Sequence, residues 1–551
     1  MKSVLTPQQV FSHVASPEIQ RSKFDRSHGY KTTLDAGKLI PVFIDEALPG
    51  DTFSLRASIF ARLATPIKPL MDNMFADIHF FSVPYRLVWD HWKQFNGEQK
   101  NPSDSTDFII PQCSTVARSG YTEQSIFDYM GLPTKVGGFS HSALPLRAYN
   151  LIWNEWFRDE NLQNSAPVPT GDGPDAPSNF GILDRNKRKD YFTSALPFAQ
   201  KHAPVVIPLG GTAPLTGLPT VTNFNTVSNG SPLTFNVADL SNVNINSNTG
   251  DTNAKFSSQA GSNTNPQIKF GNQTGSRVNG SDFLNSWSNG TLSADLSSAT
   301  ATTINALREA FQIQRMYEKD ARGGTRYTET IRAHFGVISP DARLQRPEFL
   351  GSMTAPININ PIAQTAPTVT GQTPQGNLSA MGTVSMSGNG FVKSFTEHEI
   401  VIGLLSVRAD LNYQQGLNRM WSRQTRFDFF WPSLAHLGEQ SVLKKEIMTT
   451  GSATDNEVFG YQERYAEYRY KPSLITGKFR SNSTTPLDVW HLAQSFSAVP
   501  SLNSAFITEN PPLDRVVAVP SEPKFLMDCY FNFITARPMP TYSVPGLIDH
   551  F

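Results

Sequence analysis

The stretch KLIPVFIDEALPGDTFSLRASIFARLATPIKPLMDNMFADIHFFSVP, Lys38–Pro84, decides the fold. Apolar residues alternate with others along much of it, and the clearest members of the series are Leu39, Pro41, Phe43, Phe53, Leu55, Ala57 and Ile59. A period of two places the apolar side chains on one face of a half-buried β-strand. Between the two series, LPGDT at Leu48–Thr52 has Pro and Gly in turn positions. The stretch therefore predicts β-strands joined by a turn.

The last third of the chain repeats this character. Five runs have strand-like composition: FVKSFTEHEIVIGLLSVRAD (391–410), TRFDFFW (425–431), YAEYRYKPSLITGKF (465–479), LDVWHLAQSF (487–496) and FLMDCYFNFITARPMP (525–540). With the N-terminal strands they make about eight, divided between the two ends of the chain. Strands from the two ends must pair if they share one domain. The sequence therefore predicts a mainly β fold, a single eight-stranded jelly-roll β-sandwich with long insertions and a few short helices.

Beyond the N-terminal arm, four segments are predicted to be helical. LPLRAYNLIWNEWFRDENL, Leu144–Leu162, carries apolar residues at spacings of three and four, with Pro145 in the first turn. Because further apolar residues lie off that stripe, we expect this helix to be covered on more than one side. Further helices are predicted at 87–95, 304–323 and 328–336, the last two ended by glycine.

Two segments interrupt the strands, and both ends form arms. Residues 205–303 are rich in Asn, Ser, Thr and Gly, yet large apolar residues recur, so we expect a loop-rich β excursion on the surface. Residues 353–390 are expected to be a second inserted loop. Residues 1–29 are expected to form an N-terminal arm with one short helix at Thr6–Gln9, and residues 541–551 a C-terminal arm. All belong to one jelly-roll domain spanning 1–551.

Composition limits the class of function. Lys+Arg and Asp+Glu are both 47, so the net charge is zero and the whole chain is no nucleic-acid binder by bulk electrostatics. Charged residues make up 17% and aromatic residues 11%. Such a chain can hide surface by assembly, because interface cores are poor in charge and rich in aromatics. The alternative from composition is a large β protein with long polar loops.

Compartment signals point to the interior of a cell. The two cysteines, Cys113 and Cys529, are fewer than a loop-rich secreted protein usually carries, which fits a reducing compartment. The N-terminal residues lack the apolar core of a signal peptide. No run approaches the eighteen apolar residues of a membrane span.

Motifs for chemistry are weak throughout. Glu155, Asp159 and Glu160 allow an acid/base pair, but solvated or paired carboxylates with Arg147 and Arg158 as partners explain them as well. On a strand, His398 would face away from Glu397 and Glu399, which is poor metal-ligand geometry. ITGKF (475–479) lacks the remainder of a phosphate-binding loop. We predict no catalytic, cofactor-binding or metal-ligating residue, and no enzyme.

Two segments are candidates for contact with nucleic acid. Arg185, Lys187, Arg188 and Lys189 form the densest basic cluster and are candidates to face DNA; the alternative is a solvated loop paired with Asp184 and Asp190. YQERYAEYRYK (461–471) interleaves Tyr with Arg and could stack single-stranded bases. Its glutamates would repel phosphates, so a cross-strand or inter-subunit face is the favoured interpretation.

Several long blocks carry a family likeness. They are PLMDNMFADIHFFSVPYRLVWDHWKQFNGE (69–98), LPLRAYNLIWNEWFRDENL (144–162), DYFTSALP (190–197), FGYQERYAEYRYKPSLITGKFRS (459–481) and ARPMPTYSVPGLIDHF (536–551). These blocks resemble the major capsid proteins of microviruses, small tailless viruses of bacteria with circular single-stranded DNA, and are most similar to the gokushovirus branch. They run from the N-terminal strands to the last residue and are interrupted at the two low-complexity segments.

The resemblance implies a jelly-roll subunit that assembles through pentamers into the simplest icosahedral shell, a T=1 capsid. It also implies that the insertion 205–303 forms a protrusion at the threefold axes, where host receptors are met. A small basic packaging protein would accompany the DNA, which accounts for the neutral charge, and assembly would take place in the host bacterial cytoplasm without a membrane. The family has no enzymatic activity. The rival interpretation is a β-sandwich binding module, such as an adhesin or a carbohydrate-binding protein.

Contacts between subunits are predicted at two places. The aromatic residues of the long helix and the apolar residues of the C-terminal arm give as candidates Trp153, Trp156, Phe157, Tyr542, Leu547 and Phe551. Three prolines keep the C-terminal arm extended, and it carries too much apolar surface to leave in water. We therefore expect the arm to dock on structure, either as a clasp on a neighbouring subunit or within its own.

Overall fold

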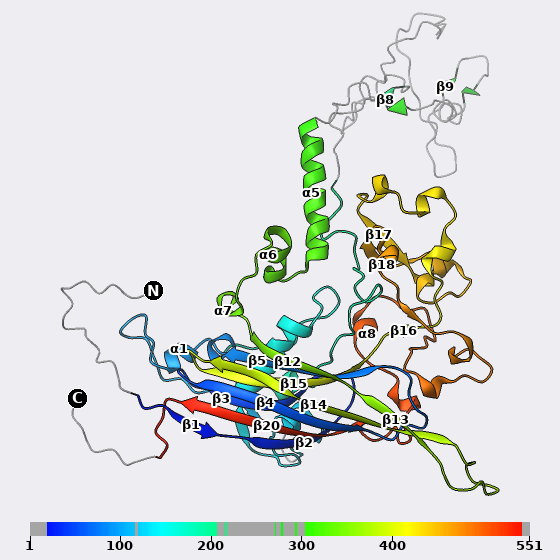
Figure 1. Cartoon of the computed structure of the whole chain (residues 1–551). Helices are drawn as coiled ribbons and strands as arrows, with labels where there is room; N and C mark the ends of the chain where they lie inside the picture. Colours follow the sequence, from blue (N-terminus) through cyan, green and yellow to red (C-terminus); the bar gives the residue numbers. More distant parts are fainter. Residues whose placement is uncertain are drawn as a thin grey trace, which may run out of the picture. The chain divides into compact units, whose positions relative to one another are not determined.

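The computed structural model describes residues 19–115, 119–205 and 304–542, together with the backbone of four two-residue strands between them. By its internal contacts the chain divides into two units. The first consists of residues 1–203 and 315–551, and the second of residues 204–314. The first unit contains both sheets of a β-sandwich (Figure 1).

Two antiparallel sheets make up the sandwich. The six-stranded sheet contains β1 (Ser22–Asp25), β2 (His28–Leu34), β4 (Thr52–Leu63), β13 (Asn358–Ala363), β14 (Leu378–Ser394) and β20 (Phe525–Arg537). The four-stranded sheet has the order β12 (Glu348–Pro356), β5 (Met74–Pro84), β15 (Glu399–Ala409), β3 (Ile40–Ala47). β1 and β2 follow one another along one edge of β20, and β13 extends the other sheet edge beyond β14. If β1 and β2 are counted as one edge strand and β13 as an extension, eight strands remain in the two sheets. The predicted jelly-roll β-sandwich is therefore confirmed.

The pairing joins the two ends of the chain. β20 lies between β4 and the β1–β2 edge, with Phe525 opposite Leu63 and Ala536 opposite Thr52 (Figure 1). In the other sheet, β15 pairs with both β3 and β5. Strands far apart in sequence therefore supply neighbours in both sheets, as the sequence predicts.

Burial along the strands explains their composition. β4 alternates strictly between buried and exposed positions, because one face of the six-stranded sheet meets the core and the other meets solvent. β15 is buried at ten of its eleven positions. A strand covered on both faces reads as a continuous apolar run, which IVIGLLSV within β15 does.

The sandwich core is dominated by aromatic side chains from both sheets. Phe53 of β4 and Phe43 of β3 both meet the ring of Phe533 of β20, at centroid distances of 4.9 and 5.2 Å and nearly perpendicular. Edge-to-face contacts of this kind add about 0.5–1.5 kcal/mol each beyond the area that they bury. All three side chains are at most 2% exposed. This cluster fixes the two sheets face to face.

Helices occupy the connections between strands. The described ones are α1 (Trp92–Phe95), α2 (Ile126–Tyr129), α3 (Leu144–Ile152), α5 (Ile304–Gly323), α6 (Tyr327–Phe335), α7 (Asp341–Leu344) and α8 (Ser504–Ile507). α3 continues as a single π-helical turn over Trp153–Phe157, so the predicted helix exists but ends before Leu162. α5 and α6 match their predictions, and Gly336 ends α6 in the left-handed conformation, with φ of 71°.

Smaller sheets complete the first unit. They are β6 (Gln112–Ser114) with β7 (Ser140–Ser142), β16 (Asn412–Tyr413) with β19 (Ser473–Leu474), and β17 (Glu439–Leu443) with β18 (Val458–Glu463). β17 and β18 belong to a lobe with its own buried cluster, which includes Phe192, Val442, Phe459 and Phe506. The sandwich and this lobe are separate hydrophobic clusters within one unit.

The second unit, residues 204–314, includes the whole of the predicted insertion 205–303. Its described backbone contains β8 (Leu215–Thr216) paired with β11 (Ser293–Ala294), and β9 (Phe270–Gly271) paired with β10 (Arg277–Val278). Both pairs are antiparallel. The first residues of α5 also belong to this unit.

The second inserted loop, expected at 353–390, is mostly strand. It contains the end of β12, all of β13 and most of β14, and only residues 364–377 connect the last two. The glycines that suggested a loop permit close approach inside the sheet. A Cβ at Gly390 would lie 3.0 Å from the ring of Phe80, and one at Gly382 would lie 2.8 Å from Leu63. Small residues here are therefore required by packing.

Three predicted strands in the last third are wrong. Residues 425–431, 465–479 and 487–496 form short 3-10 turns and irregular backbone, apart from the two residues of β19. YQERYAEYRYK (461–471) stays extended only to Glu463, and Tyr465 takes the left-handed conformation, with φ of 62°. Their aromatic residues imitated strand composition, but the first run lies exposed instead of packing on a sheet.

The N-terminal arm is shorter than expected, because β1 and the start of β2 lie within 1–29 and pair with β20. The helix predicted at Thr6–Gln9 lies outside the described residues, as does the C-terminal arm after Tyr542.

Candidate functional site

Helix α3 packs against the face of the four-stranded sheet that points away from the sandwich core. Its apolar residues join a cluster with Phe81 and Val83 of β5 and Ile402 of β15. Tyr149 is 1% exposed, donates its hydroxyl to Leu39 O and accepts from Leu183 N, both at 2.9 Å. The broad apolar surface of α3 therefore serves packing, and the prediction that it is covered on more than one side is confirmed.

Arg147 of α3 forms the most deeply buried ion pair of the described residues. Its guanidinium donates to both carboxylate oxygens of Asp175, at 2.7 and 2.8 Å, and to Val88 O at 2.9 Å. The two side chains are 0% and 3% exposed. The bidentate geometry satisfies the charges that burial would otherwise penalise. Arg147 thus ties α3 to the loop containing Asp175, not to Glu155, Asp159 or Glu160 as expected.

The aromatic residues at the end of α3, which are candidates for subunit contacts, pack within their own chain. Trp153 is 7% exposed and donates its indole N–H to Asp184 O at 2.9 Å. Trp156 donates to Pro347 O at 3.0 Å and lies under the guanidinium of Arg346 at 4.5 Å. Phe157 packs on Phe81, with centroids 5.9 Å apart. Tyr542 is 80% exposed, and Leu547 and Phe551 lie outside the described residues.

Two carboxylates that follow α3, Asp159 and Glu160, are held in ion pairs. Asp159 accepts from Lys189 Nζ at 2.6 Å. Glu160 lies 2.6 Å from Arg326 and 3.8 Å from Arg158. Burial raises the pKa of Glu160, although the Arg326 charge opposes that effect. These contacts agree with the paired-carboxylate alternative, with two of the partners supplied from outside the helix.

The four basic candidates for DNA contact do not form one patch. Arg185 points inward, pairs with Asp77 and donates to Ser406 Oγ at 2.8 Å. Burial raises the pKa of Asp77, but the charges of Arg185 and Arg408 outweigh it and hold that pKa below its usual value. Lys187 is 6% exposed, a position that no DNA phosphate reaches.

Lys187 instead links the loop to helix α8. Its Nζ donates to Phe506 O at 2.6 Å and Gln494 Oε1 at 2.8 Å, and lies 4.8 Å from the centre of the Phe506 ring. Burial lowers its pKa to about 8. Arg188 is exposed, and Lys189 keeps 53% of its side chain exposed while pairing with Asp159. Only these two of the four candidates have side chains at the surface.

The residues considered for a metal site or a phosphate-binding loop take part in packing, an ion pair and a turn. His398 packs on Trp92, with ring centroids 5.4 Å apart, while Glu397 pairs with Arg86 and Glu399 is buried. Gly477–Phe479 of ITGKF forms a single 3-10 turn. Within the described parts of the chain, no group of three or more His, Cys, Asp or Glu is placed to hold a metal ion. In those same parts, no helix is long and apolar enough to cross a membrane.

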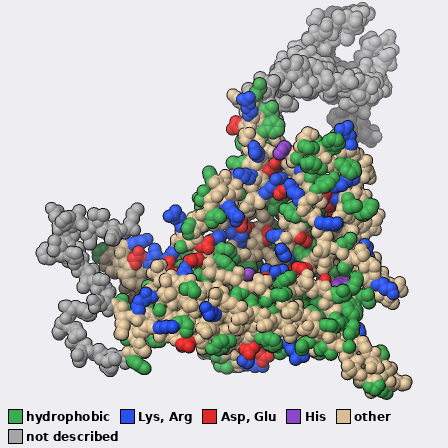
Figure 2. Space-filling model, in the orientation of Figure 1, with side chains coloured by type: hydrophobic (Ala, Val, Ile, Leu, Met, Phe, Trp, Pro, Cys, Tyr) green, Lys and Arg blue, Asp and Glu red, His purple; other side chains and the backbone are tan. Residues whose placement is uncertain are grey.

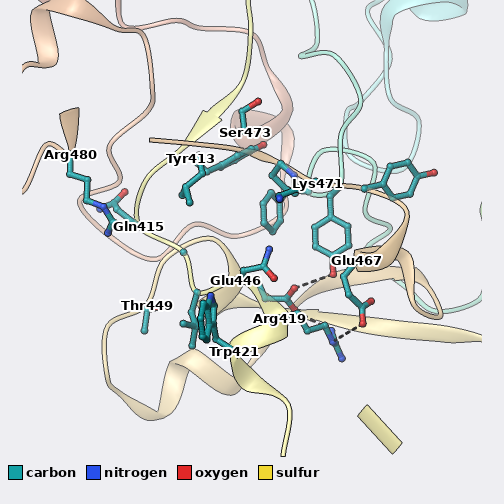
Figure 3. Close-up of a pocket in the computed structure, with 18 residues that line it drawn as sticks. Tyr413, Gln415, Arg419, Trp421, Glu446, Thr449, Glu467, Lys471, Ser473 and Arg480 are labelled. Carbon is teal, nitrogen blue, oxygen red and sulfur yellow. Dashed lines mark hydrogen bonds and ion pairs between the residues drawn. The ribbon is translucent and has the colours of Figure 1, made fainter. Parts of the chain in front are cut away.

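A cavity of about 440 Å³ opens in the lobe of β17 and β18. Arg419 lies between Glu446 and Glu467 (Figure 3), at 3.1 and 3.9 Å, and Tyr191 donates its hydroxyl to Glu446 at 3.0 Å. Burial raises the pKa of Glu446, although Arg419 opposes that effect. Both carboxylates are occupied by ion pairs with Arg419, so these contacts stabilise the lobe.

Beside this cavity lies a surface that the sequence did not single out. We call it the aromatic surface and define it as Met420, Trp421, Phe427, Phe429, Phe430, Trp431 and Tyr468, each between 43% and 72% exposed. Hydrophobic side chains gather over this lobe in Figure 2. The usable signal was FDFFW, Phe427–Trp431, where aromatic residues follow one another without the alternation of a strand.

A jelly-roll sandwich with an exposed aromatic surface, and with no metal cluster among the described residues, is compatible with a structural protein that makes contacts with other proteins. The chain belongs to a family of viral coat subunits: residues 12–547 match the family described as "Capsid protein (F protein)". It is therefore a structural capsid protein of a virion, and not an enzyme.

Three relatives cover almost the whole chain. The chain is 48% identical to capsid protein VP1 of Bdellovibrio phage phiMH2K, over 99% of its own length and 98% of the relative. It is 46% identical to capsid protein VP1 of Chlamydia phage 1, over 98% and 97%. It is 36% identical to capsid protein VP1 of Spiroplasma virus 4, also over 98% and 97%. The resemblance to microvirus capsid proteins is confirmed, and the adhesin alternative is not favoured.

Proposed function

We propose that the chain assembles through pentamers into a T=1 icosahedral shell that encloses circular single-stranded DNA. Membership of a capsid protein family implies self-assembly, and the specific proposal rests on the near full-length match to three phage capsid proteins. A single jelly-roll subunit that pairs its two chain ends suits this role, because each copy is a complete building block.

Electron microscopy of the purified full chain tests this proposal. We expect uniform closed shells, or rings of five subunits when assembly is arrested at low protein concentration. Particles that remain single subunits at all concentrations, or shells whose symmetry is not icosahedral, would contradict it.

We propose further that a small basic partner neutralises the DNA. The chain carries 47 basic and 47 acidic residues, and Arg185 and Lys187 are occupied inside the fold. Of the four basic candidates, only Arg188 and Lys189 have side chains at the surface that can contact phosphates directly.

An Arg188→Ala/Lys189→Ala variant tests the direct contact, since both side chains are at the surface and the fold should survive. Binding of single-stranded DNA should weaken and its dependence on salt should become shallower, because fewer counterions are released. Arg185→Ala is no suitable control, because it removes one of the two arginines that pair with the buried Asp77. If the salt dependence of DNA binding is unchanged in the double variant, Arg188 and Lys189 make no phosphate contacts, and the basic partner alone neutralises the DNA.

The insertion 205–303 is proposed as the protrusion at the threefold axes and as the contact with a host surface receptor. By internal contacts it falls in a unit of its own, residues 204–314. Replacing Gly211–Thr300 with a short Gly/Ser linker should leave a folded core, since long surface insertions cost little loop entropy. Antibodies raised against whole particles should map to the insertion, and mapping to the strands instead would contradict an outward position.

Assembly is proposed to take place in the cytoplasm of a bacterial host. The two described cysteines are free and buried, and neither forms a disulfide. Particles recovered from lysed cells before any release step would support this location, and particles found only outside the cells would contradict it.

A further inference from the structure

The aromatic surface is too apolar to be a finished solvent-facing surface. Phe427, Phe429 and Phe430 are 58%, 52% and 49% exposed, and Trp421 and Trp431 are 72% and 43% exposed. The run Gln424–Ser433 has no buried or half-buried residue. Apart from Phe430, which packs on the buried ring of Tyr465, it contributes nothing to a core of its own subunit, so packing within the chain does not explain its aromatic composition.

The segment nevertheless has a defined conformation. The carboxylate of Asp428 accepts from Thr425 N at 2.7 Å and Gln424 N at 3.0 Å. Trp431 donates its indole N–H to Arg426 O at 2.8 Å. Phe430 also meets the ring of Tyr465, with centroids 5.2 Å apart. The rings are thus held in place before any partner arrives, which lowers the entropy cost of binding.

Charge on this surface favours a protein partner over a nucleic acid. Arg423 lies over the rings of Phe429 and Tyr468, at 5.2 and 4.4 Å, and pairs with Glu467 at 3.5 Å. Arg426, which lies over the rings of Phe427 and Trp431, and Asp428 are both exposed and offset one another, so the surface carries no excess positive charge to attract phosphates. Aromatic residues, Met and Arg together are the composition of protein interface cores and hot spots.

The area agrees with a subunit contact. Six aromatic residues of roughly 200 Å² each, about half exposed, present on the order of 600 Å². The largest apolar patch on an ordinary monomer is about 300–600 Å², and one side of a standard interface buries about 800 Å². The aromatic surface thus supplies most of one side of such an interface.

We infer that the aromatic surface is buried against a second copy of this chain in the assembled shell, with Phe427 and Phe429 as central contacts. The inference rests on the proposed function, because it names the partner surface of that assembly. A second copy is the partner that a self-assembling capsid protein always meets.

A double variant tests the contact. Phe427→Ser/Phe429→Ser removes two rings that touch no core, so the subunit should fold with an unchanged midpoint of thermal unfolding. The protein concentration needed for half-maximal assembly should rise at least tenfold. The matched control is Phe60→Ser, an equally exposed ring at 52% on the outer face of the six-stranded sheet, which should shift assembly less than threefold.

Hydroxyl-radical labelling of the wild-type chain supplies a second measurement that needs no variant. Oxidation of Met420 and Trp421 should be at least threefold slower in empty shells than in dilute subunits. Equal protection in dilute subunits would mean that the chain covers this surface itself. Protection confined to DNA-filled particles would mean that nucleic acid covers it, and either result overturns the inference.

Different results would contradict shell assembly and the subunit contact at the aromatic surface. If the wild-type chain forms no oligomer, the proposed function falls and the inference falls with it. If the wild-type chain forms shells and the double variant does so at the same concentration, the inference alone is overturned.

Discussion

Replacing Arg147 by Met should destabilise the subunit strongly, because it would strand a buried charge. The variant removes two hydrogen bonds to Asp175, at 2.7 and 2.8 Å, and one to Val88 O at 2.9 Å. Asp175 is 3% exposed in its side chain and would have no water to replace the guanidinium. Removing one partner of a buried pair costs about 3–5 kcal/mol of unfolding free energy.

The assay is urea unfolding of dilute subunits, followed by tryptophan fluorescence. An Arg147→Met/Asp175→Asn double variant should be more stable than Arg147→Met alone, because it no longer buries an unpaired carboxylate. Lys31→Met is the control, since Lys31 and Asp528 form a 3.1 Å pair with side chains 77% and 53% exposed. Its loss should cost less than about 1 kcal/mol.

Either of two results would contradict a large stability penalty from the unpaired buried charge of Asp175. One is a loss below about 1 kcal/mol for Arg147→Met, which would place the pair among the weak surface bridges. The other is a double variant no more stable than the single one, which would show that burial of the unpaired Asp175 is not the cause.

Three further predictions concern pH, packing and the C-terminal arm. Burial, helped by the Arg185 charge, lowers the pKa of His79 to about 4. As the pH falls below 6.5, the unfolded chain therefore binds a proton on this residue before the folded chain does, and the unfolding free energy should drop by about 2 kcal/mol between pH 7 and 5. A His79→Gln variant with the same pH dependence would contradict this. Gly403→Ala would bring a Cβ to 2.8 Å from the Phe80 ring and should cost about 1–3 kcal/mol in thermal unfolding, and an unchanged midpoint would contradict the packing argument. Deleting Tyr542–Phe551 should leave a folded subunit that forms no shells in electron microscopy if the arm is a clasp, whereas normal assembly or complete unfolding would count against that role.

The sequence predicted those parts of the fold whose signal is local and repeated. β4 shows its alternation because one of its faces meets solvent, and α6 shows both its periodicity and the glycine that ends it. Segments rich in glycine and small polar residues did not show their strands, even where burial alternates as it does along β14. Residues 353–390 looked like a loop because β14 uses glycine where Phe80 and Leu63 approach closely. That requirement comes from neighbours distant in sequence and leaves no local trace.

The interior contacts of two basic candidates could not be predicted for the same reason. Arg185 and Lys187 look like a basic patch in the sequence, but their partners, Asp77 and the backbone of Phe506, lie more than a hundred residues away. Trp156 looks like an interface residue until Arg346 and Pro347 cover it. The aromatic surface was not predicted because residues 425–431 have the composition of a strand, although their aromatic residues lie exposed.

The central position of β20 sets an order on the synthesis of the chain. β4 is made early, yet its partner begins at Phe525, about 460 positions later. At 5–20 residues per second, translation leaves that edge of β4 open for roughly 20–90 s. The nascent chain therefore exposes an unpaired strand edge with a dense apolar face, a form prone to aggregation and suited to binding by chaperones. It also means that a ribosome that stalls before β20 releases a product that cannot close its sheet, so only nearly complete chains can enter a particle.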